Sequence, residues 1–395
     1  MTPSSAGQGA HSRPPASHSV YLRRRVAAVA IVAVVLAGLS FGAVNLTSSS
    51  HAAGGSTTTT GASGHTSATS STTTTAPPNP VTISAVGDTM LGNTPNLPPY
   101  PATYLQPVEA ALKAPIVFGN LEGTLTNGGY SKCGAASTDC YAFRTPPSYA
   151  LIFRAAGFTV LNSANNHSYD FSSQGVADTS AALKAVGIVQ AGLAGQIGIV
   201  TEGRTRVAFV DFAPYQLTNN LLDLPKAKLL IEKAKREANI VVVYMHAGAE
   251  GAGADHVTGA EEYYVGEDRG NPKVFAHAAI DDGANLVIAS GPHVLRGMEY
   301  YKGDLIAYSL GDFATYQDFS TSGTLALSGI LTVTLSGTGA FQSGHFTSLY
   351  LSGDGQPSVD TSGNAAQFVN GLSSADFGTA AATIGANGDL SPPAG

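Results

Sequence analysis

Cysteine is scarce in this sequence, and so is charge. The 395 residues include two cysteines, too few for a disulfide scaffold or a four-thiolate zinc site. Charged residues make up 12% of the chain, about half the usual quarter, which indicates a weakly charged surface rich in small residues. Hydrophobic residues reach 43%, enough for a sizeable core, and this excludes wholesale disorder.

Basic residues are scarce where a nucleic-acid-binding protein would need them. Of the 20 lysines and arginines, four are arginines within the first 46 residues, which contain no acidic residue. The rest of the chain holds 16 basic and 27 acidic residues, a net charge of −11. This balance excludes a basic nucleic-acid-binding body, and we expect no nucleic-acid partner.

The first 46 residues predict a membrane-targeting segment. Residues 1–25 form a basic N-terminus that ends in three consecutive arginines. Residues 26–46 carry no charge and, at ~1.5 Å per helical residue, are long enough to cross a ~30 Å hydrocarbon core. Arginines before the span keep the N-terminus cytoplasmic and place the body outside. We expect a retained membrane anchor or, with cleavage near Ala52, a secreted protein.

Two stretches of low complexity flank the remaining chain. Residues 47–80 contain 19 Ser or Thr in 34 positions, and we expect a disordered linker there. Residues 352–395 are rich in Ser, Gly, Ala and Asn and predict a loose, low-complexity C-terminal tail. One domain, 81–351, is left to fold.

Within 81–351 one pattern repeats: a short apolar run, rich in β-branched residues, ends in polar side chains. The runs cover 81–86, 116–118, 158–161, 240–245 and 286–289. Such runs are typical of strands buried on both faces. Stretches with helical character separate them, at 107–113, 147–156, 173–186, 226–238 and 272–282. This alternation predicts an α/β protein, in which ligands bind where the strands end.

The polar residues at these ends form a set with metal-binding chemistry. They are, with a sixth end included, Asp88, Asn120, Glu122, Asn165, Asn166, His167, His246, Glu250, Ser290, His293 and Asp312. Each alone has a plainer explanation, as a turn residue, a helix cap or a core histidine. Their coincidence predicts one converging site, since three of the body's six histidines belong to it. Carboxylate, amide and imidazole without thiolate suit Mn²⁺, Fe or Zn²⁺, and two such ions can hold a phosphoryl group.

The chain resembles the CapA family of capsule (poly-γ-glutamate) synthesis proteins, whose fold is related to the calcineurin-like metallophosphatases. Six motifs carry the resemblance in order, at 86–92, 120–123, 164–170, 246–250, 291–294 and 308–313. It implies a metallophosphatase-like four-layer α/β/β/α sandwich of two mixed sheets between helices. It also implies metal ligands at Asp88, Glu122, Asn166, His246 and His293, a proton donor at His167, and a pocket carboxylate at Glu250.

Four positions depart from the related patterns. Met90 and Gly291 stand where metallophosphatases have histidines, and Ser290 stands where many relatives offer one. Asp312 occupies a position where the family usually has Asn. Five ligand positions remain, which leaves open whether the site holds one divalent ion or two.

Two functions follow from the resemblance. The first is a membrane-anchored, metal-dependent, phosphoester-hydrolase-like enzyme of capsule or poly-γ-glutamate synthesis. The alternative is a non-catalytic accessory protein that binds the anionic polymer or supports membrane synthase and exporter subunits. An anionic partner would need local positive charge, because the body as a whole is acidic.

Cys133 and Cys140 lie in a Gly/Ser-rich loop after the second predicted strand, with six residues between them. Outside the membrane a local disulfide is the expected state, and it would stabilise by about 2–3 kcal/mol. Two free thiols are the alternative.

Overall fold

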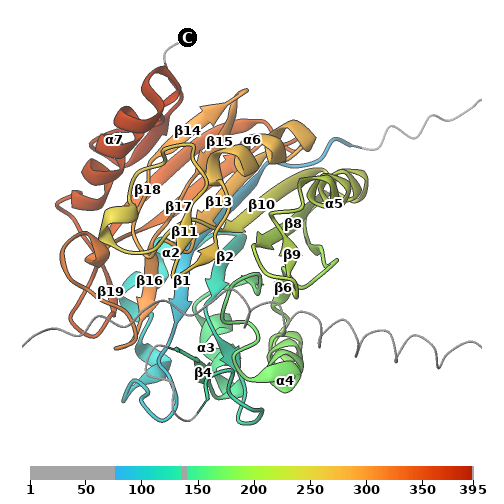
Figure 1. The fold of residues 1–395 in the computed structure, drawn as a ribbon. Helices are drawn as coiled ribbons and strands as arrows, with labels where there is room; N and C mark the ends of the chain where they lie inside the picture. The colour runs from blue at the N-terminus through green and yellow to red at the C-terminus, as the bar shows by residue number, and fades with distance from the viewer. Residues whose placement is uncertain (1–75, 135–139, 394–395) are drawn as a thin grey trace, which may run out of the picture. The chain divides into compact units, whose positions relative to one another are not determined.

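The computed structural model describes residues 76–134 and 140–393 (Figure 1). The expected basic N-terminus and membrane anchor, and the linker up to residue 75, lie outside the described residues. The described end of the linker is held in place: Arg204 donates hydrogen bonds to Pro77 and Asn79, and Thr205 donates one to Asn79. Within the described ranges, no helix is both long and apolar enough to span a bilayer.

The first large sheet has ten strands in the order β20-β21-β18-β17-β1-β2-β5-β6, with β16 beside β1 and β19 beside β18. Their bounds are β1 (Val81–Met90), β2 (Ile116–Leu121), β5 (Val160–Asn162), β6 (Val189–Ala191), β16 (Asp312–Thr315), β17 (Leu327–Leu335), β18 (Phe341–Leu351), β19 (Pro357–Val359), β20 (Thr383–Ile384) and β21 (Asp389–Ser391). The strands β16, β1, β2, β5 and β6 pair in parallel, and the others are antiparallel. The parallel half brings the carboxyl ends of β1, β2 and β5 to one edge.

The second large sheet has seven strands in the order β14-β15-β13-β10-β8-β7, with β9 beside β8. Their bounds are β7 (Gly198–Glu202), β8 (Thr205–Ala213), β9 (Asn219–Asn220), β10 (Ile240–His246), β13 (Leu286–Ser290), β14 (Met298–Tyr301) and β15 (Asp304–Ala307). Two short pairs lie in loops: β3 (Thr124–Leu125) with β4 (Arg144–Thr145), and β11 (Tyr263–Tyr264) with β12 (Glu267–Asp268). The β8, β10, β13 and β15 strands are parallel, so their carboxyl ends also share one edge.

Most of the helices lie on the outer faces of the two sheets, and the last one packs against strands of both. Their bounds are α2 (Glu109–Leu112), α3 (Ala150–Ala155), α4 (Ser172–Ala185), α5 (Leu224–Glu237), α6 (Pro272–Asp282) and α7 (Asn364–Phe377). Six 3-10 helices in the described residues are η1 (Pro101–Thr103), η2 (Gln106–Val108), η3 (Pro147–Tyr149), η4 (Ala252–Ala254), η5 (Gly323–Ala326) and η6 (Gly378–Ala380). Figure 1 shows α5 and α6 beside β8, β10 and β13 of the second sheet, and α2 and α3 beside the first.

Strand β10 shows how the layers pack. Val242 and Tyr244 point into the core between the two sheets, whereas Val243 and Met245 point into the core beneath α5 and α6. A strand buried on both faces needs a continuous apolar run, as the sequence has here. A third core joins the outer face of the first sheet to α2, α3 and α4. The molecule is therefore an α/β protein with two mixed sheets between helical layers, and the predicted α/β class is confirmed.

The outer helices begin with local signals. At α5 the side chain of Asp223 accepts a hydrogen bond from the backbone N–H of Lys226, and at α6 Asn271 accepts one from Val274. A proline occupies the first turn of each helix, where its missing N–H is not needed. Gly283 ends α6 in the left-handed conformation.

The expectation of a loose tail over 352–395 is wrong for the described residues. Strand β19 pairs with β18, and so does β21 at the other end of that strand. Helix α7 places Ala365, Val369 and Leu372 on one buried face and packs against strands of both sheets. Small and polar residues separate these apolar positions, so the composition of the segment does not indicate a buried helix face. The folded unit therefore extends beyond 351, through β21.

Candidate metal centre

Polar ends of strands from both sheets meet at one place. Strand β1 carries Asp88 near its end, β2 leads directly into Glu122, β10 ends at His246, and β13 ends at Ser290. The Ser290 hydroxyl and the backbone N–H of Gly291 donate hydrogen bonds to the Asp88 carboxylate. Asp88 thus links the two sheets where their carboxyl ends converge.

Gly87 allows an unusually close approach of two strands beside Asp88. The backbone N–H of Asp88 donates to the carbonyl oxygen of Gly311 at 2.9 Å. A Cβ atom on Gly87 would lie 1.8 Å from that oxygen, so any other residue would push the strands apart. As a result, β1 and β16 pair with Asp88 and Asp312 in register.

Asp88, Glu122 and His246 form the first group of potential ligands. One donor atom from each lies within 4.8 Å of the others, and all three residues are fully buried. His246 Nε2 is 3.7 Å from Glu122 Oε1, and His246 Nδ1 is 3.9 Å from Asp88 Oδ1. The group combines two carboxylates with one imidazole, two from strands and one from the residue that follows β2.

Asp88, His293 and Asp312 form a second group of the same kind. His293 Nδ1 lies 2.8 Å from Asp312 Oδ1 and 3.2 Å from Asp88 Oδ2. His293 has a φ angle of 57°, a left-handed conformation that is rare for a residue with a side chain and is common at functional sites. Asp88 belongs to both groups.

Unpaired buried atoms show that these donors fit a metal ion. Among the described residues, Glu122 Oε1, His246 Nε2, Asn166 Oδ1 and Asp312 Oδ2 have no hydrogen-bond partner. Buried polar atoms without a partner are costly and rare. All four atoms are oxygen or imidazole nitrogen, the donors that Mn²⁺, Fe or Zn²⁺ accept.

The carboxylates of the site respond to burial and to the charges around them. Burial alone would raise the pKa of Asp88, but His293, His246 and Ser290 lower it to about 2. Burial and the neighbouring Asp88 charge raise the pKa of Glu122 well above its ordinary value. Burial also raises the pKa of Asp312 to about 6, although His293 opposes the shift. A divalent cation would stabilise all three carboxylates in their charged form.

The histidines respond to the same surroundings. Burial lowers the pKa of His246 well below its ordinary value, so this ring is neutral and has a lone pair to offer a metal. Burial alone would also lower the pKa of His293, but Asp312 and Asp88 raise it well above the ordinary range.

A network of three asparagines fixes the carboxylates. Asn120 donates to Asp88 Oδ1 at 2.6 Å and to Glu122 Oε2. Its own side-chain oxygen accepts hydrogen bonds from Asn162 at 2.6 Å and Asn165 at 2.8 Å. Asn120 and Asn165 are thus supports of the site, and Asn162, which the sequence did not single out, holds Asn120 in place.

His167 is held at the edge of the first group. Its Nδ1 lies 2.7 Å from Asp170 Oδ2, and its Nε2 lies 3.9 Å from Glu122 Oε1. Burial lowers the pKa of His167, while Asp170 partly offsets the shift. Lys132 Nζ lies 2.6 Å from Asp170 Oδ1 and donates to the backbone oxygen of Asn166 at 3.0 Å. Among the described residues, Asn166 thus joins this network through its backbone oxygen.

The loop that carries Lys132 is closed by a disulfide. Cys133 and Cys140 are bonded to one another, with their Cα atoms 5.5 Å apart. Phe143, at the end of this loop, donates its backbone N–H to Asp170 Oδ2 at 2.6 Å, and its ring lies 4.4 Å from the His167 ring. Phe143, three residues after Cys140, therefore packs against the histidine.

Arg269 supplies the local positive charge that the sequence did not place. Its Nη2 donates to Glu250 Oε1 at 2.6 Å, and its Nη1 donates to Tyr215 at 2.7 Å. The other oxygen of Glu250 lies 3.8 Å from His293 Nε2. Arg269 follows β12 in a long loop and lacks any local motif, so only the folded chain reveals it.

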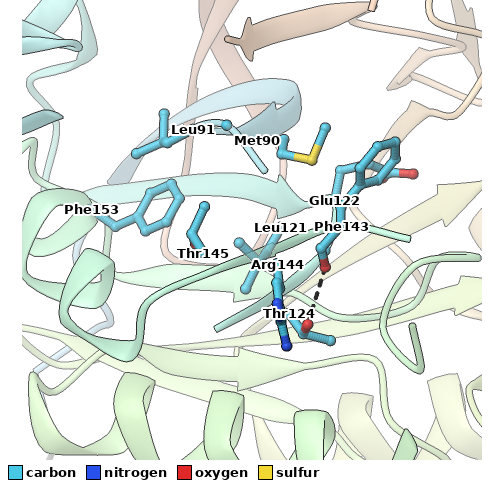
Figure 2. Close-up of a pocket in the computed structure, with 11 residues that line it drawn as sticks. Met90, Leu91, Leu121, Glu122, Thr124, Phe143, Arg144, Thr145 and Phe153 are labelled. Atoms are coloured by element: carbon cyan, nitrogen blue, oxygen red, sulfur yellow. Dashed lines mark hydrogen bonds between the residues drawn. The ribbon is translucent and has the colours of Figure 1, made fainter. Parts of the chain in front are cut away.

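The site opens to solvent on one side. The side chains of Glu250, His293 and His167 are 15%, 10% and 7% exposed, whereas those of Asp88, Glu122 and His246 are fully buried. Behind Glu122 the chain is closed: Figure 2 shows Glu122 and Phe143 side by side at one end of a small cavity. Its volume of about 10 Å³ is room for roughly one water molecule. Glu250, His293 and His167 are therefore the members of the site nearest to solvent.

The same cavity accounts for one departure from the metallophosphatase pattern. Met90 lines it together with Leu121 and Phe153, so an apolar side chain occupies the position where metallophosphatases have a histidine (Figure 2). Ser290 is engaged with Asp88 and with Tyr244, whose hydroxyl lies 3.3 Å from His246 Nδ1.

Residues 82–317 match the family described as bacterial capsule synthesis protein PGA_cap. The chain belongs to this family. This match confirms the resemblance to CapA proteins, and two relatives that are themselves named CapA support it. The chain is 31% identical over 241 residues to the PGA biosynthesis protein CapA of Bacillus subtilis, covering 57% of this chain and 59% of that protein. It is 32% identical over 199 residues to the capsule biosynthesis protein CapA of Bacillus anthracis, covering 44% of each.

A third relative has a different description. The chain is 28% identical over 220 residues to a probable polyglutamine synthesis accessory protein of Mycobacterium tuberculosis, covering 49% of this chain and 53% of that one. The matches thus span between 44% and 59% of the lengths of these three relatives.

Solved structures with some similarity include an NAD nucleotidase of Haemophilus influenzae, with a TM-score of 0.36 and 13% identity over 75% of this chain and 56% of that one. They also include GAP50, an inner membrane complex anchor of Plasmodium, with a TM-score of 0.33 and 13% identity over 74% of this chain and 95% of that one.

Proposed function

We propose that this protein is a metal-dependent, phosphoester-hydrolase-like enzyme that acts in capsule or poly-γ-glutamate synthesis. The observation that carries the proposal is the first group: Asp88, Glu122 and His246 converge fully buried from both sheets, and Glu122 Oε1 and His246 Nε2 have no hydrogen-bond partner among the described residues. Membership of a capsule-synthesis family supports the biological setting.

The metal ligands we propose are Asp88, Glu122, Asn166, His246 and His293. A divalent Mn, Fe or Zn ion bound there would supply Lewis-acid polarisation of a phosphoryl or carbonyl oxygen. The asparagine network keeps the two carboxylates of the first group oriented before substrate arrives, because Asn120 contacts both.

His167 is the proposed proton donor to the leaving group. Asp170 accepts a hydrogen bond from Nδ1, which fixes the tautomer and leaves Nε2 as the atom that holds or releases a proton. Glu250, held by Arg269, orients substrate at the open side of the site, and Arg269 offers positive charge to an anionic phosphoester or polymer.

The setting we propose is extracytoplasmic. Residues 26–46 would anchor the body to the membrane, with the linker as a stalk, or the body would be secreted after cleavage near Ala52. Membrane synthase or exporter subunits and an anionic polymer are the partners we expect, and the acidic body argues against nucleic acid.

A second candidate function is a non-catalytic accessory role in polymer synthesis or export. The apolar environment of Met90 favours it, because the site has lost a histidine position of the related enzymes. The mycobacterial relative, a probable polyglutamine synthesis accessory protein, also supports this alternative.

The test compares two double variants of the full-length chain. In Asp88→Ala/His246→Ala, metal content and hydrolysis of a phosphoester panel should fall, the latter by more than ~100-fold. His345→Ala/Asp389→Ala removes another aspartate–histidine pair, one that lies 3.0 Å apart at the exposed surface, and should change neither.

Polymer production in cells separates the two functions. If the Asp88→Ala/His246→Ala variant folds, as judged by circular dichroism, and still restores polymer to a deletion strain, the accessory role is correct and the enzyme proposal is wrong. If production fails while the His345→Ala/Asp389→Ala control restores it, the chemistry of the site is required.

A further inference from the structure

We propose that Phe143 and Phe319 form a subsite for a ring with an apolar face on the leaving group of the substrate, and that Phe319 determines specificity there. The inference rests on the proposed phosphoester hydrolysis and names its substrate class: esters whose alcohol carries such a ring, as sugar phosphates and nucleoside phosphates do. Three observations carry it.

The first observation is that both histidines nearest to solvent lie against phenyl rings. The Phe143 ring is 4.4 Å from the His167 ring, and the Phe319 ring is 4.3 Å from the His293 ring, measured between centroids. The two phenyl rings are 5.5 Å apart and meet edge to face. Tyr141, which is 66% exposed, stacks on Phe143 at 6.5 Å. These three side chains form an aromatic row that connects the surface with both histidines.

The aromatic row does not belong to the cores of the fold. Among the described residues, Phe143 and Phe319 are part of none of the three hydrophobic cores, although Phe143 is 4% exposed and Phe319 is half-buried. Ligand pockets typically combine aromatic walls with a few polar groups. Aromatic rings that pack on site histidines and on no core fit such a wall.

The second observation is that separate segments hold the two rings in place. Phe143 donates its backbone N–H to Asp170 Oδ2 at 2.6 Å. Phe319 follows β16 in a loop that is fixed at Gln317, whose backbone N–H donates to the carbonyl oxygen of Asp354 at 3.2 Å. Rings that are ordered before the ligand arrives lose little conformational entropy when it binds.

The third observation is the position of the rings beside the proposed proton donor. A leaving-group oxygen must come within ~2.6–3.2 Å of His167 to receive its proton. The rest of the leaving group then extends toward solvent past Phe143 and Phe319, the rings next to that histidine. Lys132, the cation beside His167, is already paired with Asp170 at 2.6 Å. Apolar rings therefore favour an uncharged alcohol with a ring over a charged leaving group.

The experiment measures binding of two phosphonates that cannot be hydrolysed, benzylphosphonate and ethylphosphonate, to the full-length chain in detergent with Mn²⁺ by titration calorimetry. Wild type should bind benzylphosphonate at least ~10-fold more tightly, which is the scale of one aromatic contact. Phe319→Ala should reduce this ratio at least ~5-fold, whereas Phe319→Tyr, which keeps a ring, should retain it. Equal weakening of both probes in Phe319→Ala would make Phe319 a positioning residue for His293 and overturn the proposal.

Phe341→Ala is the matched control. Phe341 is another partly buried ring in an edge-to-face aromatic pair, with 5.2 Å between the centroids. It pairs with Leu335, which pairs with Val81 at the start of β1, whereas Asp88 lies near the end of that strand. This variant should keep the wild-type ratio. Equal loss of the ratio in Phe341→Ala and Phe319→Ala would attribute the effect to a general loosening of the fold and contradict the subsite.

Competition experiments identify the source of the ring. Glucose 6-phosphate and adenosine 5′-monophosphate are both esters of a primary alcohol, and they carry a sugar ring alone or a sugar with a base. In short competition experiments, at least one should displace benzylphosphonate at a lower concentration than ethyl phosphate does, and should lose this advantage in Phe319→Ala. If neither has the advantage in wild type, the proposed substrate class is wrong.

The outcomes separate this proposal from the proposed function. A preference for benzylphosphonate that is lost in Phe319→Ala, without hydrolysis of any phosphoester, would support the subsite and contradict the enzyme proposal. Hydrolysis by a wild type that binds both phosphonates equally would overturn the subsite alone. A wild type that binds neither phosphonate would contradict both proposals.

Discussion

Individual side chains in this site depend on partners that come from distant parts of the chain. Asp88 is held by an asparagine from the neighbouring strand and by a serine from the other sheet. His167 is oriented by Asp170, and Glu250 by Arg269. Such supports restrict each functional group to one orientation, which is the condition for binding a metal or substrate without reorganisation.

Arg269 shows how much one support contributes. Arg269→Met would leave Glu250 without its cation beside the acidic cluster, and removing one partner of a buried ion pair is strongly destabilising. We expect the free energy of unfolding to fall by about 3 kcal/mol, measured by urea unfolding followed by circular dichroism.

The matched control is Lys302→Met. Lys302 pairs with Asp281 at 2.5 Å, but the two side chains are 59% and 43% exposed. Exposed pairs contribute at most ~1 kcal/mol, so this variant should unfold at nearly the wild-type urea concentration. Equal losses in the two variants would mean that Arg269 has no special structural role.

At the scale of elements, the strands could be predicted from the sequence, because their apolar runs are continuous and end in polar residues. The run 81–86 corresponds to β1 (Val81–Met90), and 240–245 to β10 (Ile240–His246). Each strand continues into its polar end, because Asp88 and His246 still make ladder hydrogen bonds. Strand ends therefore identified the metal candidates, whereas Arg269 and Lys132 lie in loops whose positions depend on tertiary contacts.

Helix α7 could not be predicted for a different reason. Its buried face consists of few apolar residues, separated by alanine, serine and asparagine, and it becomes visible only against the sheets that it covers. Composition describes how much apolar surface a segment can bury. A segment that packs against an existing core needs to bury less apolar surface than one that folds alone.

The contribution of α7 can be measured with one substitution. Val369 is fully buried in the core between the sheets, and Val369→Ala should lower the free energy of unfolding by about 2 kcal/mol. Val274 in α6 is 50% exposed, so Val274→Ala should change the free energy of unfolding by no more than ~0.5 kcal/mol. A Val369→Ala variant as stable as wild type would show that α7 is dispensable for the fold.

At the scale of the whole molecule, the candidate site lies where two sheets converge, and both sheets contribute candidate ligands. Asp88, Glu122 and Asp312 come from the first sheet or its ends, and His246 and His293 from the second. Local sequence patterns can place a ligand at the end of its own strand, but they carry no information about which sheet faces which. The four-layer arrangement could therefore be predicted only from the resemblance to a known family. Which candidate ligands lie next to one another is seen only in the structure.

This placement predicts that metal stabilises the entire fold. An ion held by residues of both sheets binds the native state and not the unfolded chain, so at about 100 times its Kd it should add about 2.7 kcal/mol to the free energy of unfolding. The melting temperature of the metal-stripped protein should therefore rise when Mn²⁺ or Zn²⁺ is added, and fall again with chelator.

Asp88→Ala should abolish the rise, because Asp88 belongs to both ligand groups. The His345→Ala/Asp389→Ala variant should keep it, since that exposed pair is outside both groups. If Asp88→Ala shows the same rise as wild type, the ion binds elsewhere and does not connect the sheets.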